Sequence, residues 1–173
     1  QGKTNVTANY TDLFGNLLTT TFTATSGYFP LDYQYVRDNI AGTGTFKRNV
    51  SNGQFTFTDE KSQMGWVYDA AVDMSGYKYL VIQTTSKQVA QAQVNIYISD
   101  KITSACCSVP LSTTELQTVV DLSTATYTSK TSNGKPLATN KIRMVTFSAG
   151  LAKKTFYVKD MFLSNDPIYE AKI

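Results

Sequence analysis

Short runs in which apolar and polar residues alternate recur along most of this chain. Residues 54–58 (QFTFT) set Phe55 and Phe57 against polar neighbours, and residues 91–99 (QAQVNIYIS) do the same with Val94, Ile96 and Ile98. A period of two predicts strands with one apolar face. Further runs rich in β-branched and aromatic residues predict strands over 17–25, 43–50, 65–73, 77–85, 117–122, 141–148 and 155–164.

Turn residues separate these runs and complete the prediction of an all-β fold. Asn52-Gly53 lies between 43–50 and 54–58, which predicts a hairpin. The one helix candidate is a single turn around 112–117 (STTELQ). We therefore expect a mostly antiparallel β-sandwich or jelly roll. A length of 173 residues suits one domain, 1–173, with its core at about 11–166.

Composition and charge exclude several classes of function. Hydrophobic residues make up 42% of the chain and charged residues 17%, which is typical of a globular protein. The net charge is +3, but the basic residues are scattered, so nucleic acid is not the expected partner. No apolar stretch approaches the roughly 20 residues of a membrane helix. Histidine is absent, which excludes Ser-His-Asp and Cys-His nucleophiles and any His-based zinc site.

The two cysteines are neighbours, Cys106 and Cys107. A disulfide between adjacent residues would be strained, because their Cα atoms lie about 3.8 Å apart. We expect two small, semi-buried free thiols.

One predicted strand face is unusual because it is polar but uncharged. The side of 91–99 opposite its apolar residues carries amides, a tyrosine and a serine where a solvated face more often carries Lys, Glu and Thr. Aromatic rings stack on the C–H faces of sugars, and amides pair with their hydroxyls. The aromatic connection 26–41 offers similar groups on a loop. Candidate sugar-binding residues are therefore Trp66, Tyr68, Gln93, Asn95 and Tyr97 on strands, Tyr33, Tyr35 and Arg37 on this loop, and Arg143.

The alternative for the aromatic candidates is packing in the core, and for Trp66 the two interpretations are evenly balanced. The carboxylates form no acid/base pair that we would defend: Asp69 and Asp73 share a strand face but lie about 13 Å apart along it, too far for a glycosidase pair. We therefore predict a protein that is not an enzyme. Two other interpretations stay open, namely a structural or interaction module that binds no sugar and a glycosidase with an unrecognised carboxylate pair.

Several segments resemble one family. The block DMSGYKYLVI (73–82), preceded by GWVYDAAV (65–72), resembles a segment of β-sandwich carbohydrate-binding modules. Such modules occur in secreted glycoside hydrolases and surface glycan-binding proteins of Bacteroidetes-type bacteria. The run KTFYVKDMFLSND (154–166) resembles their last strand, and VVDLSTATY (119–127) and NKIRMVTFSAG (140–150) resemble the two strands before it.

The resemblance implies a galactose-binding-like jelly roll that binds glycan without cleaving it. The implied ligand is a polysaccharide such as β-glucan, xylan or pectin, and an attached catalytic domain in the same polypeptide is an implied partner. The implied location is secreted or on the cell surface, at the outer-membrane exterior of a Gram-negative bacterium. The resemblance requires no cofactor, but it implies a structural calcium at Asp160, with Asp12 as the guessed opposing ligand.

Overall fold

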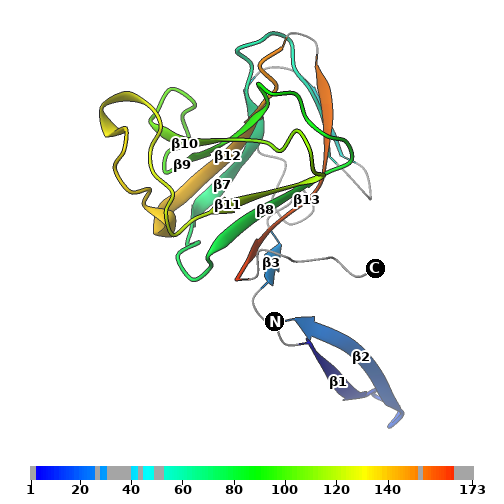
Figure 1. Ribbon diagram of the computed structural model, residues 1–173. Coiled ribbons are helices and arrows are strands. Elements are labelled where there is room, and N and C mark those ends of the chain that lie inside the picture. Colours follow the sequence, from blue (N-terminus) through cyan, green and yellow to red (C-terminus); the bar gives the residue numbers. More distant parts are fainter. Residues whose placement is uncertain are drawn as a thin grey trace.

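Two antiparallel sheets face one another, and a separate hairpin projects from them (Figure 1). The computed structural model describes residues 3–25, 28–30, 40–42, 45–48, 53–151 and 154–165. Every strand pair in these ranges is antiparallel. Within the same ranges, no helix is long and apolar enough to cross a membrane.

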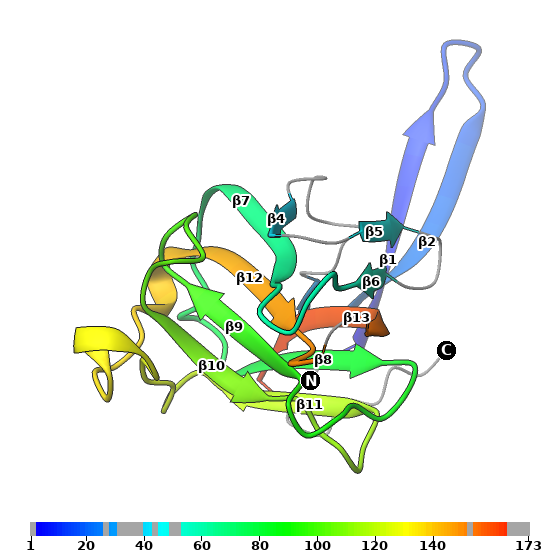
Figure 2. The same ribbon diagram turned by 90° about the horizontal axis from the view of Figure 1, so that it is seen from above.

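One sheet has five strands in the order β10-β9-β12-β7-β4. Its strands are β4 (Ile40–Gly42), β7 (Met64–Val72), β9 (Gln93–Tyr97), β10 (Cys106–Pro110) and β12 (Ile142–Ser148). The second sheet has six strands in the order β11-β8-β13-β6-β5, with β3 also paired to β13. Its strands are β3 (Tyr28–Pro30), β5 (Thr45–Arg48), β6 (Gly53–Thr56), β8 (Tyr79–Thr84), β11 (Gln117–Asp121) and β13 (Thr155–Ser164). Figure 2 shows the two layers from above.

The core lies between the sheets, and the alternation of apolar and polar residues along each strand supplies its side chains. Successive side chains of a strand point to opposite faces, so β9 buries Val94 and Ile96 and β8 buries Leu80 and Ile82 in the same cluster. Aromatic rings fill the centre: Trp66 makes an edge contact with Phe55 at a centroid distance of 5.3 Å and with Phe147 at 6.1 Å.

Close strand contact in the five-stranded sheet depends on Gly65 of β7. A Cβ at this position would lie 2.0 Å from the carbonyl oxygen of Val145 and 2.5 Å from the Cα of Thr146. Both obstructing atoms belong to the backbone of the paired strand β12, so no rotamer change can make room. Glycine is the only residue that fits here without separating the strands.

The hairpin consists of β1 (Lys3–Thr11) and β2 (Leu17–Thr25), which pair with each other over nine residues without a bulge. These two strands form a sheet of their own and join neither layer of the sandwich. Its loop is organised by Asp12: the carboxylate oxygen Oδ1 accepts hydrogen bonds from the N–H groups of Phe14 and Asn16, both at 2.9 Å. The two sheets of the sandwich thus begin at residue 28, later than the core boundary expected near residue 11.

The all-β, mostly antiparallel sandwich predicted from the sequence is confirmed, as is the hairpin of β5 and β6. Four strands, β1, β3, β4 and β10, were not predicted, and β3 and most of β4 lie in the segment 26–41 that was expected to be a connection. The expected helical turn at 112–117 is wrong, because residues 113–116 form a bend that leads into β11. In that bend the Ser112 hydroxyl accepts hydrogen bonds from the N–H groups of Thr114 and Glu115, which caps a turn but starts no helix.

Candidate functional site

Trp66 and Tyr68 do not offer a ring to a ligand, because both point into the core. The exposed fraction of Trp66 is 0%, and its indole packs between the sheets. Tyr68 is also buried, and desolvation raises the pKa of its hydroxyl. Both residues lie on the side of β7 that faces the six-stranded sheet. The structure therefore supports the interpretation that these two rings pack in the core.

Gln93, Asn95 and Tyr97 do share the outward face of β9, as their alternation predicted. Asn95 and Tyr97 are nevertheless buried, each with an exposed fraction of 1%. The Ser108 hydroxyl donates to Asn95 Oδ1 at 2.7 Å, and Asn95 Nδ2 donates to the Thr146 hydroxyl at 3.3 Å. This face is therefore a closed network of neutral polar groups, so stacking of a sugar on Tyr97 is not supported.

The side chain of Gln63 completes that network. Its Oε1 accepts hydrogen bonds from the hydroxyl of Tyr97 at 2.6 Å and from the hydroxyl of Thr146 at 2.9 Å. The phenol thus bonds within the protein, and burial is the first cause of its raised pKa. The polar residues of β9 serve the sheet's own stability, because buried hydroxyls and amides must be satisfied internally.

Arg143 lies at a different place, on β12. Its Nη1 donates to the backbone carbonyl of Asp69 at 2.6 Å, and its Nη2 lies 4.0 Å from the Asp100 carboxylate. Tyr33, Tyr35 and Arg37 lie outside the described residues.

The two aspartates expected to hold calcium are not neighbours. Asp12 lies in the loop between β1 and β2, whereas Asp160 lies on β13 of the six-stranded sheet. Figure 1 shows the hairpin projecting away from the two layers that include β13. The carboxylate of Asp12 is engaged in its own loop, where Asn16 Nδ2 donates to its Oδ2 at 2.9 Å and the pKa of the carboxyl is lowered, first by that bond. Among the described residues there is no cluster of three or more His, Cys, Asp or Glu side chains that could hold a metal. Within the part of the chain that the structure describes, Asp12 and Asp160 therefore do not form the calcium site that the resemblance implied.

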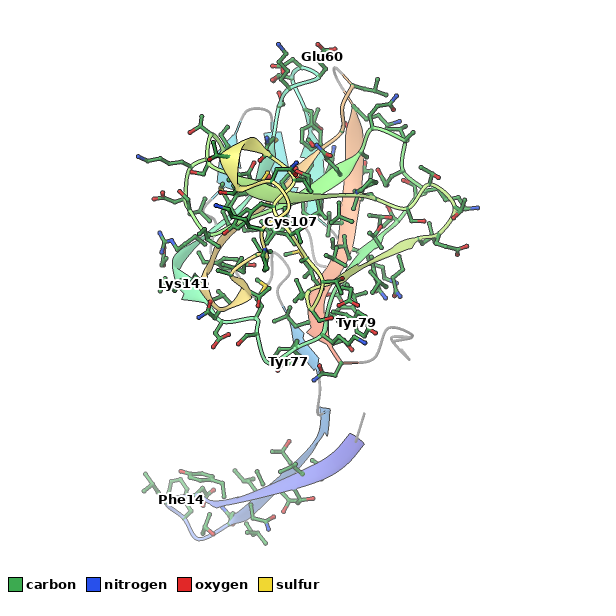
Figure 3. All side chains as sticks on the ribbon, turned by 60° about the vertical axis from the view of Figure 1, so that its left-hand side comes forward. Phe14, Glu60, Tyr77, Tyr79, Cys107 and Lys141 are labelled. Carbon is green, nitrogen blue, oxygen red and sulfur yellow. The ribbon has the colours of Figure 1, made fainter. Side chains whose placement is uncertain are left out.

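The described residues also line a cavity at one end of the sandwich. Its volume is about 280 Å³, at the lower limit of typical ligand pockets. Four segments meet there: the connection from β7 to β8, the end of β11, the 3₁₀ turn η2 (Thr139–Lys141) and the end of β13. Figure 3 shows Tyr77 and Tyr79 at this end of the sandwich. The lining residues are Ser75, Gly76, Tyr77, Lys78, Leu122, Ser123, Thr139 and Asn165.

Hydrogen bonds fix the walls of this cavity, which we call the Tyr77 cavity. Asn165 Oδ1 accepts from the N–H of Lys78 at 2.9 Å, and the N–H of Leu122 donates to the carbonyl of Lys78 at 2.7 Å. The N–H of Met74 donates to the carbonyl of Thr139 at 2.9 Å. The connection 73–78 is thereby tied to β13, β11 and η2, so the cavity is held by the backbone.

Two matched aspartate turns stand beside the cavity. Asp73 Oδ1 accepts from the N–H and the hydroxyl of Ser75, and Asp121 Oδ1 accepts in the same way from Ser123. These bonds, led in each case by the serine hydroxyl, lower the pKa of both carboxyls. The two carboxylates are therefore ionised at neutral pH and orient the two serines that line the cavity.

Lys78 supplies the positive charge at the cavity. Its Nζ lies 5.2 Å from the centroid of the Tyr79 ring. The pKa of Lys78 is raised, first by its interaction with Tyr79 and then by the carboxylate of Asp121. The Tyr77 cavity thus combines a half-buried ring, serine and threonine hydroxyls, an amide and an ammonium group, which together suit a polyhydroxylated ligand.

None of the residues that line this cavity was a candidate site residue from the sequence. A signal existed: Asp73-Met74-Ser75 and Asp121-Leu122-Ser123 repeat the pattern Asp-apolar-Ser, which is typical of an Asp side chain that caps its own turn. What the pattern could not indicate is that both turns would stand at the same end of the sandwich.

Comparisons with known proteins identify the fold. No family model matches the sequence, and no curated protein matches it. The structure, however, is similar to a low-affinity xylan-binding module, CBM86, from Roseburia intestinalis (TM-score 0.52, 14% identity), over 73% of this chain and 87% of that one. It is also similar to a family 11 carbohydrate-binding module from Clostridium thermocellum in complex with a β-1,3-1,4-mixed-linked tetrasaccharide (TM-score 0.54, 11% identity), over 82% and 97%. The chain has a carbohydrate-binding-module fold.

The same fold also occurs inside a larger enzyme. An agarase matches 84% of this chain with a TM-score of 0.51 and 11% identity, and the matched part is 25% of the agarase chain. Sequence identities this low show that the fold is similar to that of carbohydrate-binding modules, and they show nothing beyond the fold.

Proposed function

We propose that this protein binds a glycan in the Tyr77 cavity and does not cleave it. The observation that carries the proposal is the set of groups that line the cavity: a tyrosine ring beside hydroxyls and an amide. The ring would cover the apolar face of a sugar, while Ser75, Ser123 and Asn165 would bond its hydroxyls. Two structural neighbours that bind xylan and a mixed-linkage β-glucan oligosaccharide support a polysaccharide ligand.

The lack of cleavage is supported by the carboxyl groups. A glycosidase needs one carboxyl group that stays protonated near neutral pH, and therefore a raised pKa, to act as the general acid. Hydrogen bonds lower the pKa of four described carboxyl groups, namely Asp12, Asp59, Asp73 and Asp121. Such carboxylates are poor proton donors.

The affinity should be modest, because a shallow hydrated site leaves little free energy after the cost of ordering the ligand. The net charge of +3 and Lys78 favour neutral or acidic glycans over basic ones. We extend the proposal to an exported protein that targets an attached glycoside hydrolase or a surface complex to its substrate. Tyr33, Tyr35 and Arg37 stay part of the proposal as loop contacts to the same glycan.

Affinity electrophoresis on xylan, mixed-linkage β-glucan, pectin and agarose tests the proposal, with Tyr77→Ala beside the wild type. The matched control is Tyr157→Ala, a partly buried tyrosine on β13 that does not line the cavity. We expect one glycan to retard the wild type and Tyr157→Ala, and Tyr77→Ala to bind about tenfold more weakly, which is about 1.4 kcal/mol.

Other outcomes would identify the alternatives. If no glycan retards the folded wild type, the protein is a structural or interaction module. If Tyr77→Ala binds as the wild type does, the glycan binds elsewhere, and Tyr33→Ala would then test the loop. Release of sugar from any of the glycans would reveal an enzyme.

A further inference from the structure

The two serines that line the Tyr77 cavity present hydrogen-bond acceptors to it. The Ser75 hydroxyl donates its proton to Asp73 Oδ1 at 2.6 Å, and the Ser123 hydroxyl donates its proton to Asp121 Oδ1 at 2.5 Å. A serine hydroxyl has one proton to donate and two lone pairs that accept. Because each proton is committed to an aspartate, the two serines offer a ligand only their lone pairs.

The charge of the two aspartates keeps the serine protons in place. Hydrogen bonds lower the pKa of both carboxyls, so Asp73 and Asp121 are ionised at neutral pH. An ionised carboxylate accepts hydrogen bonds and donates none, and its bonds are stronger than those between neutral groups. A serine that turned its proton toward the cavity would therefore give up the stronger of its two possible bonds.

An amide and an ammonium group supply the donors of the same cavity. Asn165 Oδ1 accepts from the N–H of Lys78 at 2.9 Å, and Asn165 Nδ2 donates to the carbonyl of Gly76 at 3.4 Å. The second N–H of the amide and the ammonium of Lys78 can donate to a ligand. A free sugar hydroxyl suits this mixture, because it can accept from one of these donors and donate to a serine at once. An ether oxygen can only accept.

The cavity is also small and its walls are fixed. Its volume of about 280 Å³ lies just below the roughly 300–1,000 Å³ of pockets that enclose a drug-sized ligand. A single sugar ring is smaller than such a ligand, so one ring fits and a run of rings does not. The hydrogen bonds from Met74 to Thr139 and from Leu122 to Lys78 join backbone groups, so the walls cannot part without breaking them.

The place of a ring in a glycan chain decides how many of its hydroxyls are free. A ring inside a chain is linked through an ether oxygen on each side. The ring at the non-reducing end has an ether oxygen on one side only and keeps a hydroxyl on the other. That hydroxyl can donate to a serine of the cavity, whereas the ether oxygen of an inner ring would leave the serine unpaired.

We propose that the Tyr77 cavity binds the non-reducing end of a glycan chain, with the terminal ring inside the cavity and the rest of the chain outside. This inference rests on the proposed function, because it names the part of the glycan that the same cavity binds. The terminal ring donates hydroxyl protons to Ser75 and Ser123 and accepts from Asn165. Binding then depends on the number of chain ends and not on the length of the chains.

Shortening the polysaccharide that retards the wild type tests this inference. Limited acid hydrolysis that reduces the average chain length about tenfold raises the number of ends per gram about tenfold, while the number of inner rings per gram hardly changes. Isothermal titration calorimetry of the wild type should then give a dissociation constant, expressed as mass of glycan per volume, that falls about tenfold. Borohydride reduction, which opens only the ring at the reducing end, should leave the affinity unchanged.

Two serine variants test the acceptors directly. Ser75→Ala and Ser123→Ala each remove one hydroxyl, but the backbone N–H of each residue keeps its bond to the aspartate at 2.9 Å, which preserves the turn. We expect each variant to bind the shortened glycan about fivefold more weakly. The matched control is Ser86→Ala, an exposed serine that does not line the cavity, which should bind as the wild type does.

The outcomes separate this inference from the proposed function. If Tyr77→Ala loses binding but shortening leaves the affinity per gram unchanged, the cavity binds inner rings, so the inference is overturned while the proposed function stands. If Ser75→Ala and Ser123→Ala both bind as the wild type does, the serine acceptors play no part, and the inference is again overturned. If no glycan binds to the folded wild type, the proposed function fails and this inference fails with it.

Discussion

Replacing Gly65 by alanine tests the close pairing of β7 with β12, on which the five-stranded sheet depends. The new Cβ would lie 2.0 Å from the Val145 carbonyl oxygen, about 1.4 Å short of the 3.4 Å at which ordinary contact begins. Strands that pair at about 4.8 Å cannot separate by that amount and keep their hydrogen bonds. Because the obstruction is backbone, we expect a cost at the upper end of the range for overpacking, about 3 kcal/mol.

Urea unfolding followed by Trp66 fluorescence measures this cost, since Trp66 is the only tryptophan and lies in the core beside Gly65. A loss of about 3 kcal/mol would lower Tm by about 6–12 °C for a protein of this size. Gly76→Ala is the control, because nothing lies within 4 Å of the Cβ it adds, and its effect should stay within about 0.5 kcal/mol. Equal stability of the two variants would refute the register of β7 on β12.

Three further predictions address the network, the thiols and the cavity. Asn95→Ala should cost about 2 kcal/mol in urea unfolding, because the Ser108 hydroxyl loses its acceptor, whereas Gln93→Ala on the same face should cost far less. Cys106 and Cys107 are both free and buried, in clusters on opposite faces of β10, so neither should react with a thiol reagent until the protein unfolds, and no disulfide should join them. Glycan retardation should be constant between about pH 5 and 8, and it should decrease when the pH is lower than 3.8, the ordinary aspartate pKa. Because the pKa values of Asp73 and Asp121 are lowered in the folded protein, the ionised carboxylates stabilise their turns above pH 3.8, and this stabilisation is lost as the carboxylates bind protons. A loss of binding between pH 5 and 8 would show that another group controls the cavity.

The fold could be predicted from the sequence because alternation is a local property. Phe55 and Phe57, or Val94 and Ile96, indicate a strand and its buried face without reference to any other segment. β10 was missed because Cys106-Cys107-Ser108-Val109-Pro110 alternates weakly and ends in proline. β1 was missed because its face of Val6, Ala8 and Tyr10 is only mildly apolar and packs on no other described element.

The site could not be predicted because it depends on which face of each strand turns inward. From the sequence, Trp66 was evenly balanced between the core and a ligand, and Tyr97 was the better ligand candidate. In the structure Trp66 fills the core, and the Tyr97 hydroxyl bonds to Gln63 on the outer face. A polar, uncharged strand face indicated a ligand surface, but here hydroxyls and amides of β9, β10 and β12 satisfy each other. Tyr77, whose ring lines the cavity, belongs to a connection between strands. The alternation of apolar and polar residues does not indicate which way a side chain points in such a connection.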